Sequence, residues 1–374
     1  MVTPLSRRGR DLRRFLAVPY AIYAGDPCWV APPLMDLKQV FSDANPLFEH
    51  AEMQLWVATC QGRDVGRIAG IIDRNHLAIH QDATGFFGFF ESVEDPAVCV
   101  ALVDAVRAWA RQRNLRSVRG PMNPTPNDEC GLLVDGFDSP PVLMMTYNPR
   151  YYPALLEQAG LDKARDLLAF HIDLSQTPMN RFERLAARVR SRNPSLRFRP
   201  VLKRSLSADL DKVKEVYNAA WADNWGFTPM TDAEVDFLAG RLKPLFTEGL
   251  VWLAEDGSEP VGFLLAVLDF NVALQPLRGR LLSPGLFRAL PYFLRWKTPR
   301  MCRVMTLGVK DGHRGRGLES VMLYEGLQTG CRLGLTGAEA SWILEDNTAM
   351  CRMLEVFGAR VYKTYRIYEG PVDR

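Results

Sequence analysis

The sequence lacks the features that mark three large classes of protein. No run of apolar residues reaches the length that a bilayer-spanning helix needs. The seven cysteines are scattered without paired spacing, and an odd, unclustered set indicates reduced thiols rather than a disulfide framework or a zinc site. Among five histidines, His76 and His80 lie four residues apart, but no acidic or cysteine pattern accompanies them. We therefore expect no membrane span, no disulfide framework and no metal site.

Acidic residues are missing from one long stretch of the chain. Between Asp269 and Asp311 there is no aspartate or glutamate, whereas eight arginines and lysines lie there. The formal net charge of the whole chain is only +3, so the rest of the chain carries about −5. A protein that is not broadly basic is a poor candidate for nucleic-acid binding. The positive charge is instead concentrated in one segment.

What is present indicates an ordinary folded protein. At 374 residues, 47% of them hydrophobic and 24% charged, the chain is long enough for two domains with substantial cores. The N-terminal residues are basic and then mildly apolar, but Arg13, Arg14 and Pro19 interrupt the apolar run and no small-residue cleavage site follows. We expect this stretch to be a helix of the fold, in a cytoplasmic protein.

Residues in the first half of the chain recur in the second half at nearly constant spacing. Five of them recur at an offset of 196 residues, since Trp56, Ala58, Val65, Gly66 and Asp73 match Trp252, Ala254, Val261, Gly262 and Asp269. Two smaller groups recur at offsets of 197 and 198 residues. Three groups at nearly one offset predict a duplicated domain, with residues 1–175 and 176–374 as the two copies.

The spacing of apolar residues predicts similar elements in both copies. In the first copy we expect helices over 11–24, 95–114 and 151–159, a hairpin over 54–73, and strands over 85–91, 117–120 and 167–173. In the second copy we expect helices over 179–192, 209–221, 231–245 and 347–357, a hairpin over 250–269, and strands over 197–201, 304–309, 338–342 and 360–368. Residues 270–300 are an insertion that the first copy lacks.

A glycine-rich turn follows the strand at 304–309 and runs into a helix. It contains Arg314, Gly315, Arg316 and Gly317. Such a turn directs several unpaired backbone N–H groups at one point, beside the positive end of the helix dipole, and so predicts an anion site. Similar turns also occur without a ligand. The first copy has the acidic sequence SVEDPAV at this place, so we expect a single anion site, in the second copy.

These motifs resemble those of the GNAT acyltransferases. Arg314-x-x-Gly317-x-Glu319, after a Leu307-x-Val309 strand, resembles the family's motif for the pyrophosphate of acyl-CoA. The family usually has glycine or alanine where this chain has Glu319, and a carboxylate there repels the pyrophosphate unless it points away. The resemblance implies an α/β (α+β) fold of two tandem GNAT-like domains with mixed, mostly antiparallel sheets flanked by helices. It also implies acyl-CoA as co-substrate, with a first domain that is degenerate and lacks the pyrophosphate loop.

A second family motif follows in EASWILEDNTAMCRMLEVFGA, where Asn347 stands at the position of the CoA-contacting asparagine. The resemblance therefore implies a set of cofactor-binding residues, namely Leu307, Val309, Arg314, Gly315, Arg316, Gly317, Leu318, Glu319 and Asn347. The tyrosine that often serves the family as general acid is here Leu354. That role is unfilled or passes to another residue such as Tyr362 or Tyr365.

More narrowly, segments such as NPLFEHAEM, RGPMNPTPNDECGLLVDGFD and ARVYKTYRIYE resemble the bacterial two-domain GNAT proteins that include the ceramide synthases. This resemblance implies transfer of a fatty acyl group from acyl-CoA to the amine of a sphingoid-type base. Two other functions stay open: N-acetyl transfer to a small amine or a protein amine, and binding of acyl-CoA without turnover.

Candidate catalytic residues come from the second copy. Glu339 is the first candidate for a general base, because its strand is expected to diverge from the cofactor strand where the pantetheine arm enters; it could equally be paired with an arginine. Glu345 and Asp346 are second candidates, although next to Asn347 they could simply cap a helix. Tyr365 is a candidate acid.

The acceptor side is less well defined. The insertion offers apolar and aromatic residues among only basic charges, so residues 278–300 are expected to contact a membrane surface peripherally, to hold CoA phosphates, or to form an ordinary core helix. Asn127 and Glu129, in a long polar loop, could line the acceptor pocket or form a solvated turn. Trp225 could line an acyl channel or belong to the core.

Overall fold

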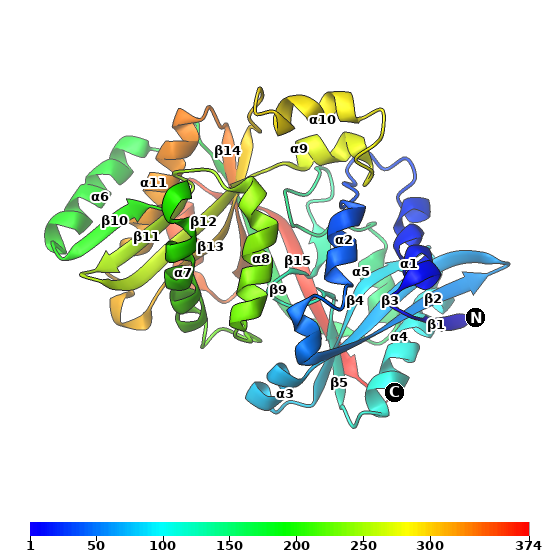
Figure 1. Cartoon of the computed structure of the whole chain (residues 1–374). Helices are drawn as coiled ribbons and strands as arrows, with labels where there is room; N and C mark the ends of the chain where they lie inside the picture. The colour runs from blue at the N-terminus through cyan, green and yellow to red at the C-terminus, as the bar shows by residue number, and fades with distance from the viewer. Residues whose placement is uncertain (374) are drawn as a thin grey trace. The chain divides into compact units, whose positions relative to one another are not determined.

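The chain forms two compact units in a computed structural model that describes residues 1–373 (Figure 1). Unit 1 consists of Met1–Leu167, Leu277–Ser283 and the residues from Lys363 onwards. Unit 2 consists of Leu168–Pro276 and Pro284–Tyr362. None of the helices formed by residues 1–373 combines the length and the apolar character that crossing a bilayer requires.

Unit 1 is built on a sheet whose strands follow the order β1-β2-β3-β4-β5-β15. Its strands are β1 (Val2–Leu5), β2 (Ala51–Cys60), β3 (Arg63–Asp73), β4 (Thr84–Ser92), β5 (Ser117–Gly120), the short β6 (Met122–Asn123), β7 (Glu129–Cys130) and β8 (Leu132–Asp135), and the last part of β15 (Arg360–Pro371). Its helices are α1 (Gly9–Ile22), α2 (Leu34–Val40), α3 (Arg74–His80), α4 (Pro96–Arg111) and α5 (Tyr152–Gln158).

Unit 2 has a sheet of the same kind, in the order β10-β11-β12-β13-β14-β9. Its strands are the last part of β9 (Asp162–Asp173), β10 (Leu196–Pro200), β11 (Val251–Asp256), β12 (Glu259–Leu268), β13 (Met301–Val309) and β14 (Gly337–Leu344). Its helices are α6 (Met179–Arg192), α7 (Leu206–Ala220), α8 (Asp232–Leu242), α9 (Asn271–Leu274), α10 (Leu286–Phe293), α11 (Leu318–Arg332) and α12 (Thr348–Val356).

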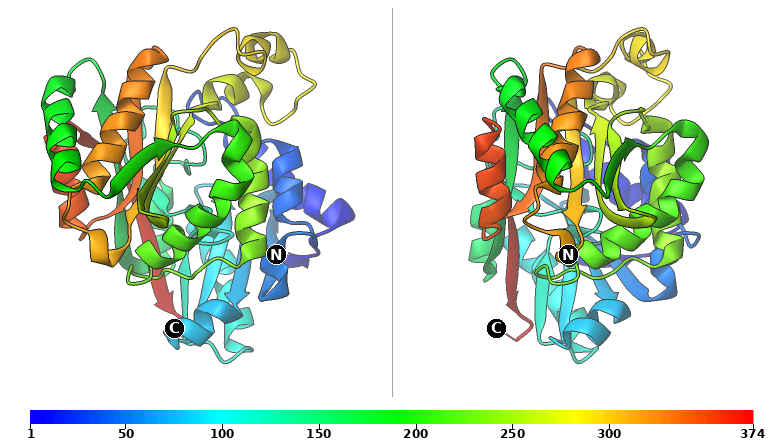
Figure 2. Two further views of the ribbon diagram at one scale, coloured as in Figure 1. Left: turned by 60° about the vertical axis from the view of Figure 1, so that its left-hand side comes forward. Right: turned by 90° about the vertical axis from the view of Figure 1, so that its left-hand side faces the viewer.

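Each unit pairs its first four strands antiparallel and its fourth and fifth strands parallel. The expected mixed, mostly antiparallel sheets flanked by helices are therefore confirmed. In unit 2 the two faces of β11 are covered by different helices (Figure 2), because Trp252 and Ala254 pack with α6 and α11 whereas Val251 and Leu253 pack with α7. Because both faces of the strand are buried, successive residues are all apolar, and the sequence shows a continuous apolar run.

The duplication is visible in the register of the two hairpins. Ala58 pairs with Gly66 in unit 1, and Ala254 pairs with Gly262 in unit 2, at the positions that match in the sequence. In both hairpins the register shifts immediately after this pair. A bulge at the same place in two hairpins is a specific feature that independent strands would rarely share. The repeat predicted from the sequence therefore corresponds to repeated structure.

Strand β1 was not expected from the sequence, which predicts only a helix near the N-terminus. That helix is present as α1, but β1 precedes it and pairs with β2. Pro4 of β1 lies opposite Trp56, as Pro200 of β10 lies opposite Trp252. The offset of 196 residues between the two prolines is the offset of the repeat, so the repeat itself could have revealed this strand.

The sixth strand of each sheet comes from the other half of the sequence. In unit 1, Tyr368 of β15 pairs with Gly120 of β5 and is fully buried. In unit 2, Phe170 and Ile172 of β9 belong to the main core cluster, and the Leu174 amide donates to the Thr336 carbonyl at 3.1 Å. The compact units therefore differ from the expected division at residues 175 and 176, because each copy lends its last strand to the other unit.

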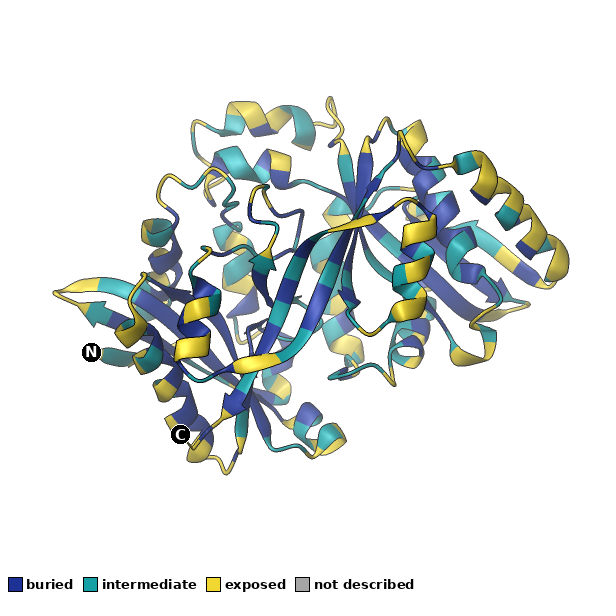
Figure 3. Ribbon diagram, turned by 180° about the vertical axis from the view of Figure 1, so that it is seen from behind, coloured by how far each residue is buried: buried dark blue, intermediate teal, exposed yellow. Residues whose placement is uncertain are grey.

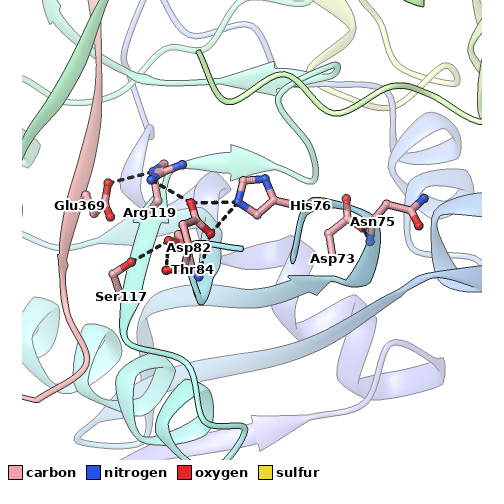
Figure 4. Close-up of polar contacts among 8 residues, drawn as sticks. All are labelled: Asp73, Asn75, His76, Asp82, Thr84, Ser117, Arg119 and Glu369. Carbon is pink, nitrogen blue, oxygen red and sulfur yellow. Dashed lines mark hydrogen bonds and ion pairs between the residues drawn. The ribbon is translucent and has the colours of Figure 1, made fainter. Parts of the chain in front are cut away.

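Unit 1 contains a buried histidine in a network of charged groups (Figure 4). His76 of α3 is only 1% exposed, and its Nε2 lies 3.1 Å from Oδ1 of Asp82. Arg119 donates from Nη2 to Asp82 and from Nε to Glu369, at 3.4 and 2.9 Å. The ring of His80 lies tilted against that of His76, with centroids 4.4 Å apart. Within residues 1–373 no three His, Cys, Asp or Glu side chains gather as a metal site would need.

Burial of His76 leads to a prediction about stability and pH. Burial lowers the pKa of His76 despite the nearby Asp82 carboxylate, so the folded state binds this proton less readily than the unfolded state. The contribution of neutral His76 to the free energy of unfolding is therefore complete above the unfolded-state pKa of about 6.5, and it is lost as the pH falls below that value. We expect the Tm to drop between pH 7 and 5, and to drop less in His76→Gln. An equal drop in both proteins, measured by thermal unfolding, would contradict this assignment.

Candidate active site

Strands β13 and β14 of unit 2 are paired only over their first part. Met301 to Val304 lie opposite Gly337 to Ala340, and no pairing continues beyond them among the described residues. On its other side, β13 contains a bulge, because Thr306 faces Leu265 and Val304 faces Ala266, which leaves Met305 as the extra residue. A bulge bends its strand and increases its twist. The two strands thus separate just after Val304 and Ala340, as the sequence predicted for the cofactor strand and its neighbour.

The glycine-rich turn lies at the end of β13. Gly315 and Gly317 have φ angles of +73° and +86°, and Gly317 is the N-cap of α11. A side chain on Gly317 would place its Cβ 2.9 Å from a methyl group of Val189. The amide of Val321 donates to the Gly317 carbonyl at 3.2 Å, and the N–H groups earlier in this first turn have no intrahelical acceptor. The geometry is that of an anion cradle.

Arg314 and Arg316 both brace this turn. Arg314 donates from Nε to the Val309 carbonyl at 3.2 Å and from Nη2 to the Ala220 carbonyl at 2.6 Å. Arg316 donates from Nε and Nη2 to the side-chain oxygen of Asn193 at 3.0 and 2.7 Å. The two guanidinium groups therefore fix the turn to its neighbours and add positive charge beside it.

The remaining residues of the turn contribute in different ways. Leu318 is fully buried in the core, so only its backbone N–H is available to an anion. Burial raises the pKa of Glu319, an effect that its own backbone N–H and the charge of Arg314 oppose. A higher pKa favours the neutral carboxylic acid, which repels an anion less than a carboxylate does. Burial thus acts on Glu319 in the direction that lessens this repulsion.

A buried polar cluster lies where β13 and β14 separate. Arg303 and Glu339 face each other in the last paired part of the strands and are 2% and 0% exposed. Ser341 receives a hydrogen bond from Nε of Arg303 at 3.0 Å and donates to Glu339. The hydroxyl of Tyr362 donates to the other carboxylate oxygen of Glu339. Glu339 therefore lies at the strand separation and is linked to Arg303 through Ser341, a position that fits both alternatives left open by the sequence.

Tyr362 and His171 extend this cluster. Tyr362 is only partly buried, so its phenol connects the buried Glu339 with more accessible surroundings. The ring of His171 meets that of Tyr362 edge-on, with centroids 5.7 Å apart. Burial, and then the charge of Arg360, lowers the pKa of His171, although Asp173 and Glu339 act in the opposite direction. His171 is therefore neutral near pH 7, and it can accept or donate a hydrogen bond but carries no charge.

The side chain of Thr306 has a buried hydroxyl group without a hydrogen-bond partner among the described residues. Thr306 and Arg303 lie opposite Leu265 and Val267, which alternate by two along β12, so both face the same side of the sheet. Buried polar groups normally have a partner. An unsatisfied hydroxyl beside the strand separation is suited to a ligand with polar groups.

Four residues near Glu339 were not among those predicted from the sequence: Arg303, Ser341, Thr306 and His171. A signal existed for Ser341, because a residue two positions after Glu339 on a strand shares its face. Arg303 is a charged residue within an apolar strand, as Glu339 is, and could have been recognised by the same reasoning. Their contact depends on the register between strands, which no local pattern contains.

The other candidates lie in three places. Glu345 and Asp346 follow β14, and α12 is capped by Asn347, whose side-chain oxygen accepts from the Met350 amide at 3.1 Å. Asn347 therefore supplies a side-chain cap to α12. Leu354 is buried in the core. Trp225 belongs to unit 2, whereas the other three candidates, Tyr365, Asn127 and Glu129, belong to unit 1 and are not brought to Glu339 within one unit.

The corresponding place in unit 1 is filled by the chain itself. Strands β4 and β5 pair in parallel from Thr84 to Phe86, and β6 then lies against β4. A Cβ on Gly88 would come within 1.6 Å of the Met122 carbonyl oxygen, and the Phe89 amide donates to the Asn123 side chain at 2.6 Å. The next helix, α4, begins with a carboxylate as its cap, because Asp95 accepts from the Ala97 amide at 2.9 Å. Neither feature leaves room for an anionic ligand.

Comparison with known proteins adds to this geometry. No family model matches the chain. The chain is 37% identical over 366 residues to the bacterial ceramide synthase of Caulobacter vibrioides (strain NA1000 / CB15N), covering 96% of this chain and 94% of that protein. It is 34% identical over 369 residues to protein YghO of Escherichia coli (strain K12), covering 97% and 93%. A tandem GNAT protein from the clavulanic acid biosynthesis pathway has a similar structure, with a TM-score of 0.60 at 14% identity, covering 100% of this chain and 99% of that one.

Proposed function

Because the chain belongs to the tandem-domain GNAT acyltransferase family that includes the bacterial ceramide synthase of Caulobacter vibrioides, we propose that it transfers a fatty acyl group from acyl-CoA to the amine of a long-chain, sphingoid-type base. The observation that carries this proposal is the 37% identity to that protein over 96% of the chain. Membership of the family implies a CoA thioester as donor and an amine as acceptor. The fatty chain and the lipid acceptor are the proposed part.

The residues of unit 2 fit acyl-CoA as a substrate. The backbone N–H groups from Gly315 to Leu318 are suited to the pyrophosphate, with Arg314 and Arg316 adding positive charge. The separated strands leave the backbone of Leu307 and Val309 for the amide groups of the pantetheine arm, as the resemblance implies. Thr306 supplies a hydroxyl without a partner, and Asn347 can offer its side-chain N–H₂ because its oxygen caps α12. Unit 1 has no counterpart of this cradle, which supports a single cofactor site.

The reaction requires a neutral amine to attack the thioester carbonyl and one proton to move from nitrogen to sulfur. Tyr362 and Glu339 form a pair that can move this proton. The phenol of Tyr362 accepts a proton from the attacking amine while it passes its own proton to Glu339. The proton then returns through Tyr362 to the departing CoA thiolate. One C–N bond forms and one C–S bond breaks, and both residues end in their starting states.

The first test is turnover with acyl-CoAs of graded chain length and a sphingoid base, following free CoA and lipid product together. We expect product with long acyl chains. Turnover of acetyl-CoA alone would support N-acetyl transfer to a smaller amine instead. CoA binding without release of free CoA on addition of amine would support a non-catalytic acyl-CoA-binding protein.

Substituting Tyr362 and Tyr365 one at a time distinguishes these two candidates for the general acid. Because Tyr362 contacts Glu339, Tyr362→Phe and Glu339→Gln are expected to lower kcat by about a hundredfold or more, with little change in the KM for acyl-CoA. Tyr365→Phe is the matched control, since Tyr365 is buried in unit 1, and it is expected to retain most of the activity. A larger loss in Tyr365→Phe than in Tyr362→Phe would reverse the assignment.

A further inference from the structure

Helix α10 exposes the apolar face that a helix normally buries. Phe287 and Trp296 are 83% and 75% exposed, and Leu290, Phe293 and Leu294 are between 37% and 46% exposed. Figure 3 colours much of this helix as exposed. Phe287, Leu290 and Leu294 follow the i, i+3, i+7 spacing of one helix face. We call these five residues the α10 patch. A contiguous apolar patch of this kind marks an interaction surface.

The α10 patch is held in an ordered position. Ala289 of this helix is fully buried, and α10 packs against α9 within unit 2. After the helix ends at Phe293, the amides of Trp296 and Lys297 both donate to the Pro291 carbonyl, at 2.8 and 3.0 Å. This turn keeps Trp296 beside the helix.

The chain segment that carries the α10 patch has only positive charges. Arg288, Arg295, Lys297 and Arg300 are exposed, and the sequence has no aspartate or glutamate between Asp269 and Asp311. A protein partner would typically meet such a surface with scattered charges of both signs. An apolar and aromatic face in a segment that carries exposed cations and no acidic residue is complementary to a bilayer that contains anionic lipids. The tryptophan and the long basic side chains suit the boundary between headgroups and acyl chains.

We propose that the α10 patch docks the protein onto the surface of a bilayer containing anionic lipids, with Phe287 and Trp296 inserted at the boundary of the acyl chains and the basic residues on the headgroups. Docking does not depend on which amine is acylated. It concerns where the protein works, and it places unit 2 next to any acceptor that resides in the membrane.

The test is sedimentation of the full chain with vesicles of phosphatidylcholine alone or mixed with phosphatidylglycerol. We expect the protein to bind the anionic vesicles, to bind them less at high salt, and to bind the neutral vesicles weakly. The double variant Phe287→Glu, Trp296→Glu is expected to lose at least about tenfold in vesicle affinity. Met35→Glu is the matched control, since Met35 is exposed but lies on α2, and it is expected to bind as the unmodified protein does.

Acyl-CoA binding in the absence of vesicles separates docking from the proposed function. The double variant should bind acyl-CoA as the unmodified protein does, because the cradle at Gly317 is unchanged. Equal binding of the double variant and the unmodified protein to anionic vesicles would overturn the proposal. Equal binding of the unmodified protein to neutral and anionic vesicles would also overturn it. A third contradicting result is that the unmodified protein binds neither kind of vesicle but forms a dimer in solution that the double variant does not form.

Discussion

Replacing Gly317 with aspartate is expected to raise the dissociation constant for acyl-CoA by at least about a hundredfold. Three effects act in the same direction. Gly317 has a φ of +86°, which side chains other than glycine rarely adopt. Its Cβ would lie 2.9 Å from Val189. The new carboxylate would also place a negative charge where the N–H groups of α11 point, in competition with the pyrophosphate.

Gly317→Ala separates these effects, because it introduces the backbone strain and the contact with Val189 without the charge. We expect it to weaken binding less than Gly317→Asp does. Gly315→Ala is a second control: Gly315 also has a positive φ, but no atom would lie within 4 Å of its Cβ. Binding is measured by calorimetry, and the Tm of each variant shows whether the fold is intact. Normal binding by a folded Gly317→Asp protein would remove the turn from the cofactor site.

Separately produced fragments 1–175 and 176–374 are expected not to fold on their own. The second fragment lacks β9, whose Phe170 and Ile172 are 1% and 0% exposed within the core of unit 2. The first fragment lacks β15, whose Tyr368 is fully buried in the core of unit 1. Losing an entire buried strand removes its hydrogen bonds and exposes the apolar residues that it covered. Circular dichroism and the cooperativity of thermal unfolding are the measurements.

A longer second fragment provides the control. Fragment 162–374 retains β9 and is expected to unfold cooperatively, whereas 176–374 is not. Mixing 1–175 with 176–374 should restore folding, because together they supply both strands. Cooperative unfolding of 176–374 alone would show that β9 is dispensable for unit 2.

The sequence allowed the repeat, the hairpins and the glycine-rich turn to be predicted because each depends on local patterns. Trp56 and Trp252 sit in equivalent hairpins, and Gly317 needs a positive φ whatever surrounds it. Helix α6 has the bounds that its apolar spacing predicts, 179–192.

Other features depend on how distant strands are paired. Strands β9 and β15 have the same apolar alternation in either sheet, so the sequence does not reveal which sheet each one completes. The link from Arg303 through Ser341 to Glu339 and Tyr362 requires the register of β13 and β14 and the position of β15. The exposure of Phe287 could not be predicted either, because an amphipathic helix has the same spacing whether its apolar face is covered or not.

In unit 1, the segment Met122–Asn123 occupies the place beside β4 that corresponds to the ligand site proposed in unit 2. Asn123 satisfies the backbone amide of Phe89 from within the chain, so this part of the sheet does not await a small molecule to order it. We therefore expect ordering on ligand binding to be confined to unit 2. In hydrogen exchange, addition of acyl-CoA should slow the amides of β13 and the first turn of α11 while leaving those of β4 and α4 unchanged. Such a result would show that unit 2 responds to the ligand whereas unit 1 is ordered without one.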